Sequence, residues 1–420
     1  MLKKERRLGR LELRLAVVSP FLDRQHGTEL CITEQIERFV SKENWNVELY
    51  SQKVSQVNGI RSVAERADPD ASGSIVWHRV SDIPGPHLLK YLWWFCANRL
   101  QRWRDNRSGK VHSDLVYSPG INCLDADVIV VHIVFHAFYE SVRAELKLSH
   151  VSPGNWPRLV HRHLYYRLIM ALEQRVYTDT RTRLIAVSSL VASQLKTHFG
   201  RNDAVVIPNA VDSSRFNPEA RAVKRYVSRK SFGYDEDKFV LLLIGNDWKK
   251  KGLEILLKAV KSLKNTELRL LIVGSDDAAL FLPLIDQLNL RNQVRFERPA
   301  SDVLGFYATA DAYLGPSLED AFNLPILESM ACGLPVIASI KAGASELIRH
   351  GENGLLLRDP TDADELTNLI EQITKNSTFR QELGSAAARD VRSECNWDQN
   401  AARTAELLEA ALKSKCDRSL

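Results

Sequence analysis

The sequence has no paired cysteines, no long apolar run and no internal repeat. Its six cysteines are scattered along 420 residues and form no C-x-x-C. This argues against a disulfide framework or a zinc site and is typical of a protein in a reducing cytosol. No apolar run long enough for a signal peptide or a membrane span follows the basic N-terminal stretch. We therefore expect a cytoplasmic protein.

The composition is that of a globular protein with two domains. Hydrophobic residues make up 45% of the chain and charged residues 26%, and 420 residues exceed one ordinary core. The formal net charge is +5, and the basic excess lies in the first half of the chain. That excess suits an anionic partner, either nucleic acid or a membrane surface, and suits equally well an ordinary solvated surface.

Short β-branched runs alternate with longer periodic segments, which predicts parallel, doubly wound sheets of the α/β class. The first series of expected strands comprises 13–19, 47–50, 75–78, 114–117, 128–132 and 184–187, with a helix at 28–41. The second series comprises 240–244, 269–273, 294–296, 312–314 and 336–338, with a helix at 253–263. Sheets of this kind bind ligands at the carboxyl ends of their strands.

A stretch rich in Pro, Asn and Ser, residues 206–218, separates the two series and marks a connector. We expect an N-terminal domain over 1–212 and a C-terminal domain over 213–398. The last helix, within 399–420, is expected to pack back on the first domain. Two such domains would face each other across a cleft that holds the active site.

The segment 316–339 is the most informative part of the chain. A polar loop leads into a helix that Pro325 opens, and Gly333-Leu334-Pro335 then precede a β-branched strand. The helix start presents free backbone N–H groups and a positive dipole end, which together form an anion site. Asp320 and Glu328 bracket it, and their carboxylates can accept hydrogen bonds from sugar hydroxyls. The segment therefore predicts a nucleotide-sugar pocket.

These residues resemble those of a known family, the retaining glycosyltransferases of family 4 (glycosyl transferases group 1). The resemblance is strongest in ESMACGLPVIAS and ENGLLL, within 320–357, and good in IAVSS and IPNAVDSSRFNP, within 184–218. Asp320 and Glu328 also fit the family's pair of acidic residues separated by seven others. The resemblance implies the GT-B arrangement: two Rossmann-like domains, with the acceptor side in the first and the donor nucleotide in the second.

The resemblance implies roles for five residues of the second domain. Glu328 would bind the ribose hydroxyls of the donor. Asp320, where the family usually has Glu, would contact the hydroxyls of the transferred sugar, and adjacent Glu319 could take its place. Asn323 stands where Gly is common and suits a backbone with positive φ. The backbone N–H groups of Asn323 and Leu324 would cap the leaving phosphate or the sugar.

A lysine cluster precedes Gly252. Lys251 resembles the family's phosphate-binding lysine and would neutralise the charge that builds on the departing diphosphate. The family often has an Arg after the strand glycine, where Asn246 stands here, so Lys249 or Lys250 could supply that cation. The alternative is a solvated lysine cluster, which the dipole of the following helix disfavours.

Two residues of the first domain join the predicted site. Gly27 lies in Gln25-His26-Gly27-Thr28, where the family usually has two glycines near the donor, and an ordinary turn glycine remains the alternative. His132 ends an expected strand at a position where the family has a histidine that touches the transferred sugar or its acceptor. His136 could take that position instead, and a purely structural His132 is the remaining alternative.

The predicted activity is transfer of a sugar from a UDP- or GDP-sugar to a glycan or a lipid-linked glycan, with retention at the anomeric carbon. Cell-surface polysaccharide or lipopolysaccharide synthesis would use such a step. No cofactor and no metal are expected, because no DxD motif ends a strand and helix N–H groups with lysines can take the place of a metal. The alternatives are a nucleotide-sugar epimerase, a phosphorylase or a catalytically silent binding subunit. Nucleic acid is not an expected partner, since no recognition module is visible.

The segment 88–104 is aromatic on one face and basic on the other. Its charges make it too polar to span a bilayer. It could lie on an anionic membrane and place the enzyme at the inner face of the cytoplasmic membrane. The alternative is a core helix with snorkelling arginines.

Overall fold

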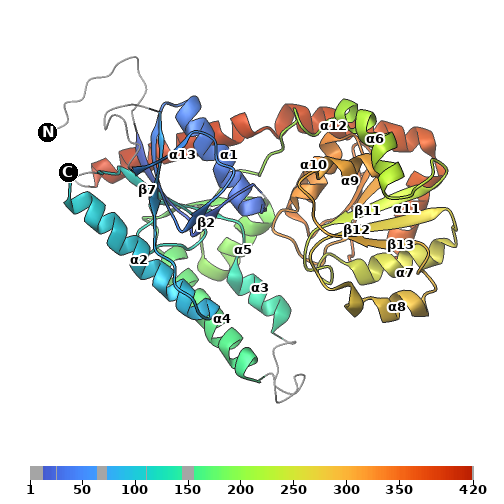
Figure 1. The fold of residues 1–420 in the computed structure, drawn as a ribbon, viewed down its shortest axis with the longest axis horizontal. Helices are drawn as coiled ribbons and strands as arrows, with labels where there is room; N and C mark the ends of the chain where they lie inside the picture. Colours follow the sequence, from blue (N-terminus) through green and yellow to red (C-terminus); the bar gives the residue numbers. More distant parts are fainter. Residues whose placement is uncertain (1–12, 25, 64–72, 110, 144–155, 419–420) are drawn as a thin grey trace. The chain divides into compact units, whose positions relative to one another are not determined.

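The computed structural model describes residues 13–24, 26–63, 73–109, 111–143 and 156–418, and the chain divides into two compact units (Figure 1). The first unit comprises the described residues within 1–187, 191–207 and 398–420, and the second comprises 188–190 and 208–397.

The division between the units falls after Ile207, a few residues before the boundary expected at 212. The difference has a local cause. The backbone N–H of Val211 donates to the carbonyl of Cys395 at 3.0 Å, so this part of the connector already bonds within the second unit. The chain from Asp398 onward belongs to the first unit.

Within the described residues, the first unit is built on a parallel sheet of eight strands. These are β1 (Arg14–Val18), β3 (Asn46–Ser51), β5 (Ile60–Ser62), β6 (Ile75–Arg79), β7 (Leu115–Pro119), β8 (Val128–Val131), β9 (Arg183–Ala186) and β10 (Val205–Val206). Their order across the sheet is β10-β9-β8-β7-β1-β3-β6-β5. A separate parallel pair consists of β2 (Phe21–Leu22) and β4 (Lys53–Val54).

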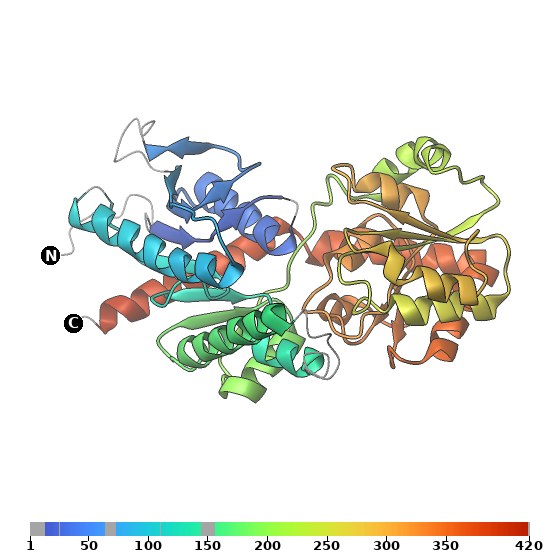
Figure 2. The ribbon, with the colours of Figure 1, turned by 60° about the horizontal axis from the view of Figure 1, so that its bottom comes forward.

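Helices cover both faces of this sheet. Those lying wholly or mainly in the first unit are α1 (Gly27–Ser41), α2 (His87–Arg107), α3 (Phe135–Val142), α4 (Trp156–Tyr177), α5 (Ser189–Phe199) and α13 (Trp397–Asp417). Figures 1 and 2 show α1 and α13 on one face and α2 and α4 on the other. Buried Gln35 of α1 donates to Asn400 of α13 at 2.8 Å and accepts from Tyr117 of β7 at 2.6 Å. This polar link ties the C-terminal helix to the sheet.

The second unit, which the structure describes throughout, contains a parallel sheet of six strands. They are β11 (Phe239–Ile244), β12 (Leu268–Val273), β13 (Val294–Glu297), β14 (Ala312–Gly315), β15 (Val336–Ser339) and β16 (Leu355–Leu357). Their order is β13-β12-β11-β14-β15-β16. Because all pairs are parallel, the carboxyl ends of the strands lie along one edge.

The helices of the second unit are α6 (Pro218–Ser231), α7 (Leu253–Leu263), α8 (Leu282–Gln287), α9 (Leu304–Thr309), α10 (Leu324–Ala331), α11 (Ala363–Lys375) and α12 (Ser377–Glu394), with 3₁₀ turns η4 (Ala278–Leu280) and η5 (Gly343–Leu347). In α7 and α11 the buried aliphatic side chains recur at i, i+3, i+4 and i+7, so each helix has one apolar stripe. Both stripes pack with the leucine-rich strands β11 and β12 in one core.

All the expected strands are present, with ends displaced by at most two residues. The helix expected at 253–263 matches α7, and the one expected at 28–41 begins one residue earlier. The short strands β2, β4, β5, β10 and β16 were not expected. Each has only two or three residues, so its hydrophobic pattern is too short to recognise.

Candidate functional site

Two loops meet at the carboxyl edge of the second sheet. One follows β11 and ends at Gly252, and the other follows β14 and begins at Pro316. The backbone N–H of Leu318 donates to the carbonyl of Lys250 at 2.8 Å. Gly252 has a φ of +78°, and a Cβ there would lie 2.1 Å from the carbonyl oxygen of Pro316. Only glycine permits this approach, which places the lysine-rich loop directly against the acidic loop.

Lys251 and Asp320 form an ion pair between these loops. Nζ of Lys251 lies 2.6 Å from Oδ2 of Asp320, and the two side chains are 16% and 18% exposed. The other carboxylate oxygen of Asp320 accepts from the backbone N–H of Phe322 at 3.2 Å. The lysine predicted for the phosphates and the carboxylate predicted for the sugar are therefore adjacent. Because Asp320 rather than Glu319 makes this contact, the geometry favours Asp320 of the two.

Asn323 caps the start of α10 in a left-handed conformation, with φ 70° and ψ 71°. This agrees with the expectation that asparagine replaces glycine at a position of positive φ. Its buried side chain accepts a hydrogen bond from Tyr313 at 3.2 Å and donates to Ser317 at 3.3 Å. These bonds fix the backbone at the start of α10. The N–H group of Leu324, the first residue of the helix, comes directly after Asn323.

Glu328 lies one turn further along α10. The buried hydroxyl of Tyr307 in α9 donates a hydrogen bond to its Oε2. Burial raises the pKa of Glu328 above its ordinary value, while the Tyr307 hydrogen bond and the charge of Arg215 act in the opposite direction. Tyr307 itself packs edge-on against Phe216 at 5.8 Å between ring centroids. Glu328 is thus held in one orientation by a residue that is itself fixed by packing.

Two predicted donor-binding residues of the loop before Gly252 make contacts within the protein, Asn246 through its side chain and Lys250 through its backbone. The amide oxygen of Asn246 accepts from the backbone N–H of Ser275 at 2.8 Å, which joins the loops after β11 and β12. Lys250 contributes its carbonyl to the contact between the two loops. Asn246 therefore acts as a loop support in this structure, and Lys251 is the lysine that reaches Asp320.

The predicted residues of the first unit lie at the carboxyl ends of its strands. Gly27 is exposed at the first position of α1, and His26 before it contacts Asp23 at 2.9 Å. His132 directly follows β8. Both its ring nitrogens are shielded from solvent, and neither makes a hydrogen bond among the described residues. Burial lowers the pKa of His132 to about 4, so its imidazole is neutral near pH 7.

His136, the alternative to His132, is already engaged. Its Nδ1 lies 2.6 Å from Glu173, and Glu173 also accepts the backbone N–H groups of Phe135 and His136 at 2.6 and 2.9 Å. Burial raises the pKa of Glu173. The pair caps the start of α3 and has a structural explanation. Neither ring nitrogen of His132 has a hydrogen-bond partner in the described part of the chain, which makes His132 the better candidate for a ligand contact.

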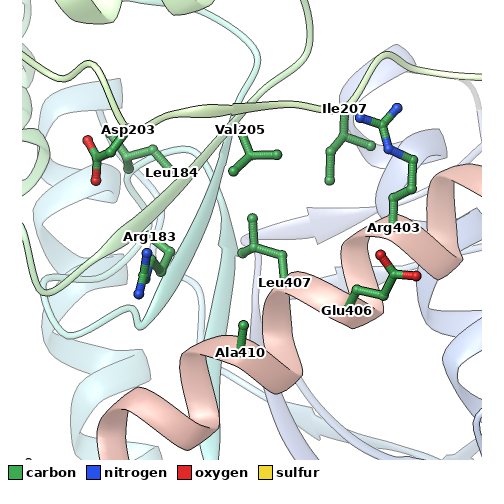
Figure 3. A pocket seen from close by; sticks show the side chains of 9 residues that line it. All are labelled: Arg183, Leu184, Asp203, Val205, Ile207, Arg403, Glu406, Leu407 and Ala410. Carbon is green, nitrogen blue, oxygen red and sulfur yellow. The ribbon is translucent and has the colours of Figure 1, made fainter.

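A cavity of about 440 Å³ lies in the first unit between β9, β10 and α13 (Figure 3). Its lining among the described residues includes none of the predicted site residues. Those lining residues are Arg183, Leu184, Asp203, Val205, Ile207, Arg403, Glu406, Leu407 and Ala410. The guanidinium of Arg403 donates one hydrogen bond to the carbonyl of Val206 at 2.8 Å.

Tyr307 and Tyr313 are site residues that the sequence did not reveal. Both are fully buried, and their hydroxyls reach Glu328 and Asn323 respectively. Tyr313 carried a usable signal, since a hydroxyl in a buried apolar strand needs a hydrogen-bond partner. Tyr307 carried none, because its partner follows 21 residues later on another helix.

Two family models match the chain. The model "Glycosyltransferase Family 4" matches residues 27–215, and the model "Glycosyl transferases group 1" matches residues 225–390. The second match contains Lys251, Asp320 and Glu328, and the first contains His132.

Curated relatives match part of the chain. A D-inositol 3-phosphate glycosyltransferase of Pseudarthrobacter chlorophenolicus is 32% identical over 251 residues, which cover 57% of this chain and 58% of that protein. An uncharacterized glycosyltransferase of Methanocaldococcus jannaschii is 28% identical over 244 residues, covering 55% of this chain and 60% of that protein. The chain thus spans less than two thirds of the length of these relatives.

Solved structures of the same fold cover nearly the whole chain. WaaG, a glycosyltransferase involved in lipopolysaccharide biosynthesis, has a TM-score of 0.70 at 19% identity and covers 94% of this chain and 99% of its own. Anabaena HepE, solved in complex with UDP-glucose, has a TM-score of 0.68 at 19% identity and covers 95% of this chain and 100% of its own. The two parallel-sheet units are therefore those of the fold that these enzymes share.

Proposed function

Because the chain belongs to the group 1 glycosyltransferases, with the GT-B fold, we propose that it transfers a sugar from a UDP- or GDP-sugar to a glycan or lipid-linked glycan, with retention at the anomeric carbon. One observation carries the proposal. The carboxyl edge of the second sheet brings together Lys251, Asp320, Asn323 and Glu328 from two loops and one helix. This is the edge at which parallel sheets bind ligands.

Each group has a chemical task in this proposal. Glu328 accepts hydrogen bonds from the ribose hydroxyls, and Tyr307 fixes its orientation. Lys251 and the start of α10 neutralise the diphosphate as it departs, so that positive charge can develop on the sugar ring. Asp320 accepts from the hydroxyls of the transferred sugar. Retention and independence of metal ions are parts of the proposal, and turnover that persists in EDTA would support the second.

The comparisons support a nucleotide-sugar donor and leave several acceptors to test. HepE was solved with UDP-glucose, which favours the uridine donor. WaaG is named for lipopolysaccharide biosynthesis, which supports a glycan or lipid-linked acceptor. An inositol phosphate belongs in the acceptor panel, because the relative from Pseudarthrobacter chlorophenolicus is named for that substrate.

The donor is tested by thermal stability in the presence of UDP-, GDP-, ADP- and CMP-sugars. A donor at 100 times its Kd adds about 2.7 kcal/mol to the free energy of unfolding. We expect sugars of one nucleotide base to stabilise the protein. We then expect transfer that depends on the acceptor and keeps the anomeric configuration. Conversion of the donor sugar to its epimer without an acceptor would indicate an epimerase, and binding without turnover would indicate a silent subunit. No stabilisation by any donor would overturn the proposal.

Glu328→Ala is expected to abolish donor binding, because the ribose loses its carboxylate acceptor. In the unchanged protein, donor affinity should also fall as the pH drops through the pKa of Glu328. Since burial raises that pKa, the loss should begin at a higher pH than for an exposed glutamate. Calorimetric titration of donor across pH measures both effects. Glu382→Ala, at an exposed position of α12, is the matched control and should bind normally. Full activity of Glu328→Ala would show that the site assignment is wrong.

Tyr307→Phe is expected to weaken donor binding roughly fivefold, since one hydrogen bond contributes about 1 kcal/mol. The hydroxyl lowers the pKa of Glu328. Its removal should therefore raise the pH at which donor binding is lost on acidification, which is the acid limb of the binding curve. A purely structural role for Tyr307 would change stability and leave that limb in place. Tyr226→Phe, at a position of α6 that is 68% exposed, is the control. An acid limb that does not move would contradict this positioning role.

A further inference from the structure

Two neighbouring helices of the first unit expose apolar stripes. On α2 the exposed side chains include Leu89, Leu92, Trp93, Leu100 and Trp103, spaced three or four residues apart or at multiples of a turn. On α4 they include Trp156, Val160 and Leu164, each four residues from the next. The opposite side of α2 is the buried one and carries Trp94 and Asn98.

The two helices lie on the same face of the first sheet and approach each other at one end of α2 (Figures 1 and 2). The rings of Tyr91 on α2 and Tyr165 on α4 meet at 5.7 Å in an edge-to-face contact. Neither Tyr91 nor Tyr165 belongs to the apolar stripes. The outer surface of the α2–α4 pair, defined by the exposed residues of these two helices, therefore remains apolar after the helices have packed together.

This α2–α4 surface is also strongly basic. Its exposed cations are Arg99, Arg104, Arg107, Arg158, Arg162, Arg167 and Arg175. The sequences of the two helices contain only two carboxylates, Asp105 and Glu173. Both are directed inward: Asp105 lies 3.1 Å from Nδ1 of His78, and Glu173 lies 2.6 Å from His136. The exposed charge is thus of one sign.

The exposure of α2 argues against the interpretation of 88–104 as a core helix. A core helix with snorkelling arginines would bury its leucines and tryptophans, whereas Leu100 is 44% exposed and Trp103 is 53% exposed. Arg107 lies over the ring of Trp103 at 5.2 Å, so cation and aromatic ring are presented together. Among the described residues, no helix combines the length and the apolar character needed to cross a bilayer.

We propose that the α2–α4 surface binds an anionic lipid membrane in the plane of the interface. Leucine, valine and tryptophan side chains would enter the boundary between headgroups and acyl chains, and the arginines would contact anionic headgroups. Nucleic acid fits less well, because the aliphatic side chains would find no apolar surface to cover. The inference is independent of the donor chemistry, since it uses no residue of the predicted donor site.

Vesicle sedimentation tests the proposal with the full chain. The purified protein should sediment with vesicles of phosphatidylcholine and phosphatidylglycerol in equal amounts and remain in solution with phosphatidylcholine alone. Two double variants remove the two contributions separately: Leu100→Ser with Trp103→Ser, and Arg99→Gln with Arg104→Gln. Each should weaken binding to the anionic vesicles by roughly tenfold or more.

Matched controls come from the second unit. Val223 and Val227 of α6 are 82% and 68% exposed, so Val223→Ser with Val227→Ser removes two exposed apolar side chains elsewhere. Lys230→Gln with Lys261→Gln removes two exposed charges elsewhere. The controls should bind vesicles normally, and all variants should keep the thermal transition of the unchanged protein.

Several results would overturn the proposal. They are no binding to anionic vesicles, equal binding to both vesicle types, α2 variants that bind as well as the controls, or displacement of the protein from vesicles by an oligonucleotide that it binds more tightly.

Discussion

Replacing Lys251 with methionine is expected to lower kcat by about 10²–10³-fold, the range measured when one preorganised donor to a developing anion is removed. In the proposed mechanism, the ammonium of Lys251 neutralises charge that appears on the diphosphate only as the bond to the sugar breaks. Its loss should therefore affect kcat more than the Kd of the donor. Single-turnover kinetics and a separate donor titration distinguish the two.

The control for Lys251 is Lys258→Met, which removes an exposed lysine from α7 whose partner is Glu254 at 2.7 Å. It should leave kcat unchanged. The Lys251 variant also leaves Asp320 without its cation, so the unfolding transition must be measured alongside. A stable Lys251→Met protein with normal kcat would remove this lysine from the mechanism.

Gly252→Ala is expected to destabilise the protein by about 2–6 kcal/mol and to abolish donor binding. About 1–3 kcal/mol comes from a side chain at positive φ, and a similar amount comes from the clash with the carbonyl of Pro316. The added Cβ would lie 2.1 Å from that oxygen, which belongs to the backbone and has little freedom to move. The loop carrying Lys251 would separate from the loop carrying Asp320.

Gly351→Ala is a matched control for this prediction. Gly351 has a φ of +82°, and a Cβ there would meet nothing within 4 Å. It should show the cost of positive φ without the clash, about 1–3 kcal/mol, and should keep donor binding. Denaturant unfolding and donor titration of both variants give the comparison. Equal losses of stability at the two positions would mean that the contact with Pro316 is relaxed in solution.

The sequence was sufficient for those features that depend on local pattern. The strand 240–244 is apolar throughout and lies in the middle of its sheet, with residues 240–243 buried, as its residues indicate. The helix 253–263 ends where its apolar periodicity ends. Asn323 has positive φ, as the resemblance suggested by placing it where the family commonly has glycine. Each of these features follows from neighbouring residues, so no distant contact was needed to recognise it.

Features that depend on contacts between distant residues could not be read in this way. Lys251 and Asp320 are 69 positions apart, and their pairing requires the parallel order of β11 and β14. The role of Asn246 as a support for the next loop depends on β12 lying beside β11. Burial of Tyr307 and its bond to Glu328 depend on how α9 packs near α10. Propensity and periodicity contain no information on such pairings.

The ion pair between Lys251 and Asp320 has a consequence for selectivity among anions. Before any ligand arrives, the positive charge of this lysine is already balanced by a neighbour at 2.6 Å. A free inorganic phosphate that approaches it meets the carboxylate as well, and like charges repel. A ligand that carries hydroxyl donors beside its phosphate satisfies both members of the pair at once. In the proposed function, this ion pair therefore favours a phosphate that is linked to a sugar over free inorganic phosphate.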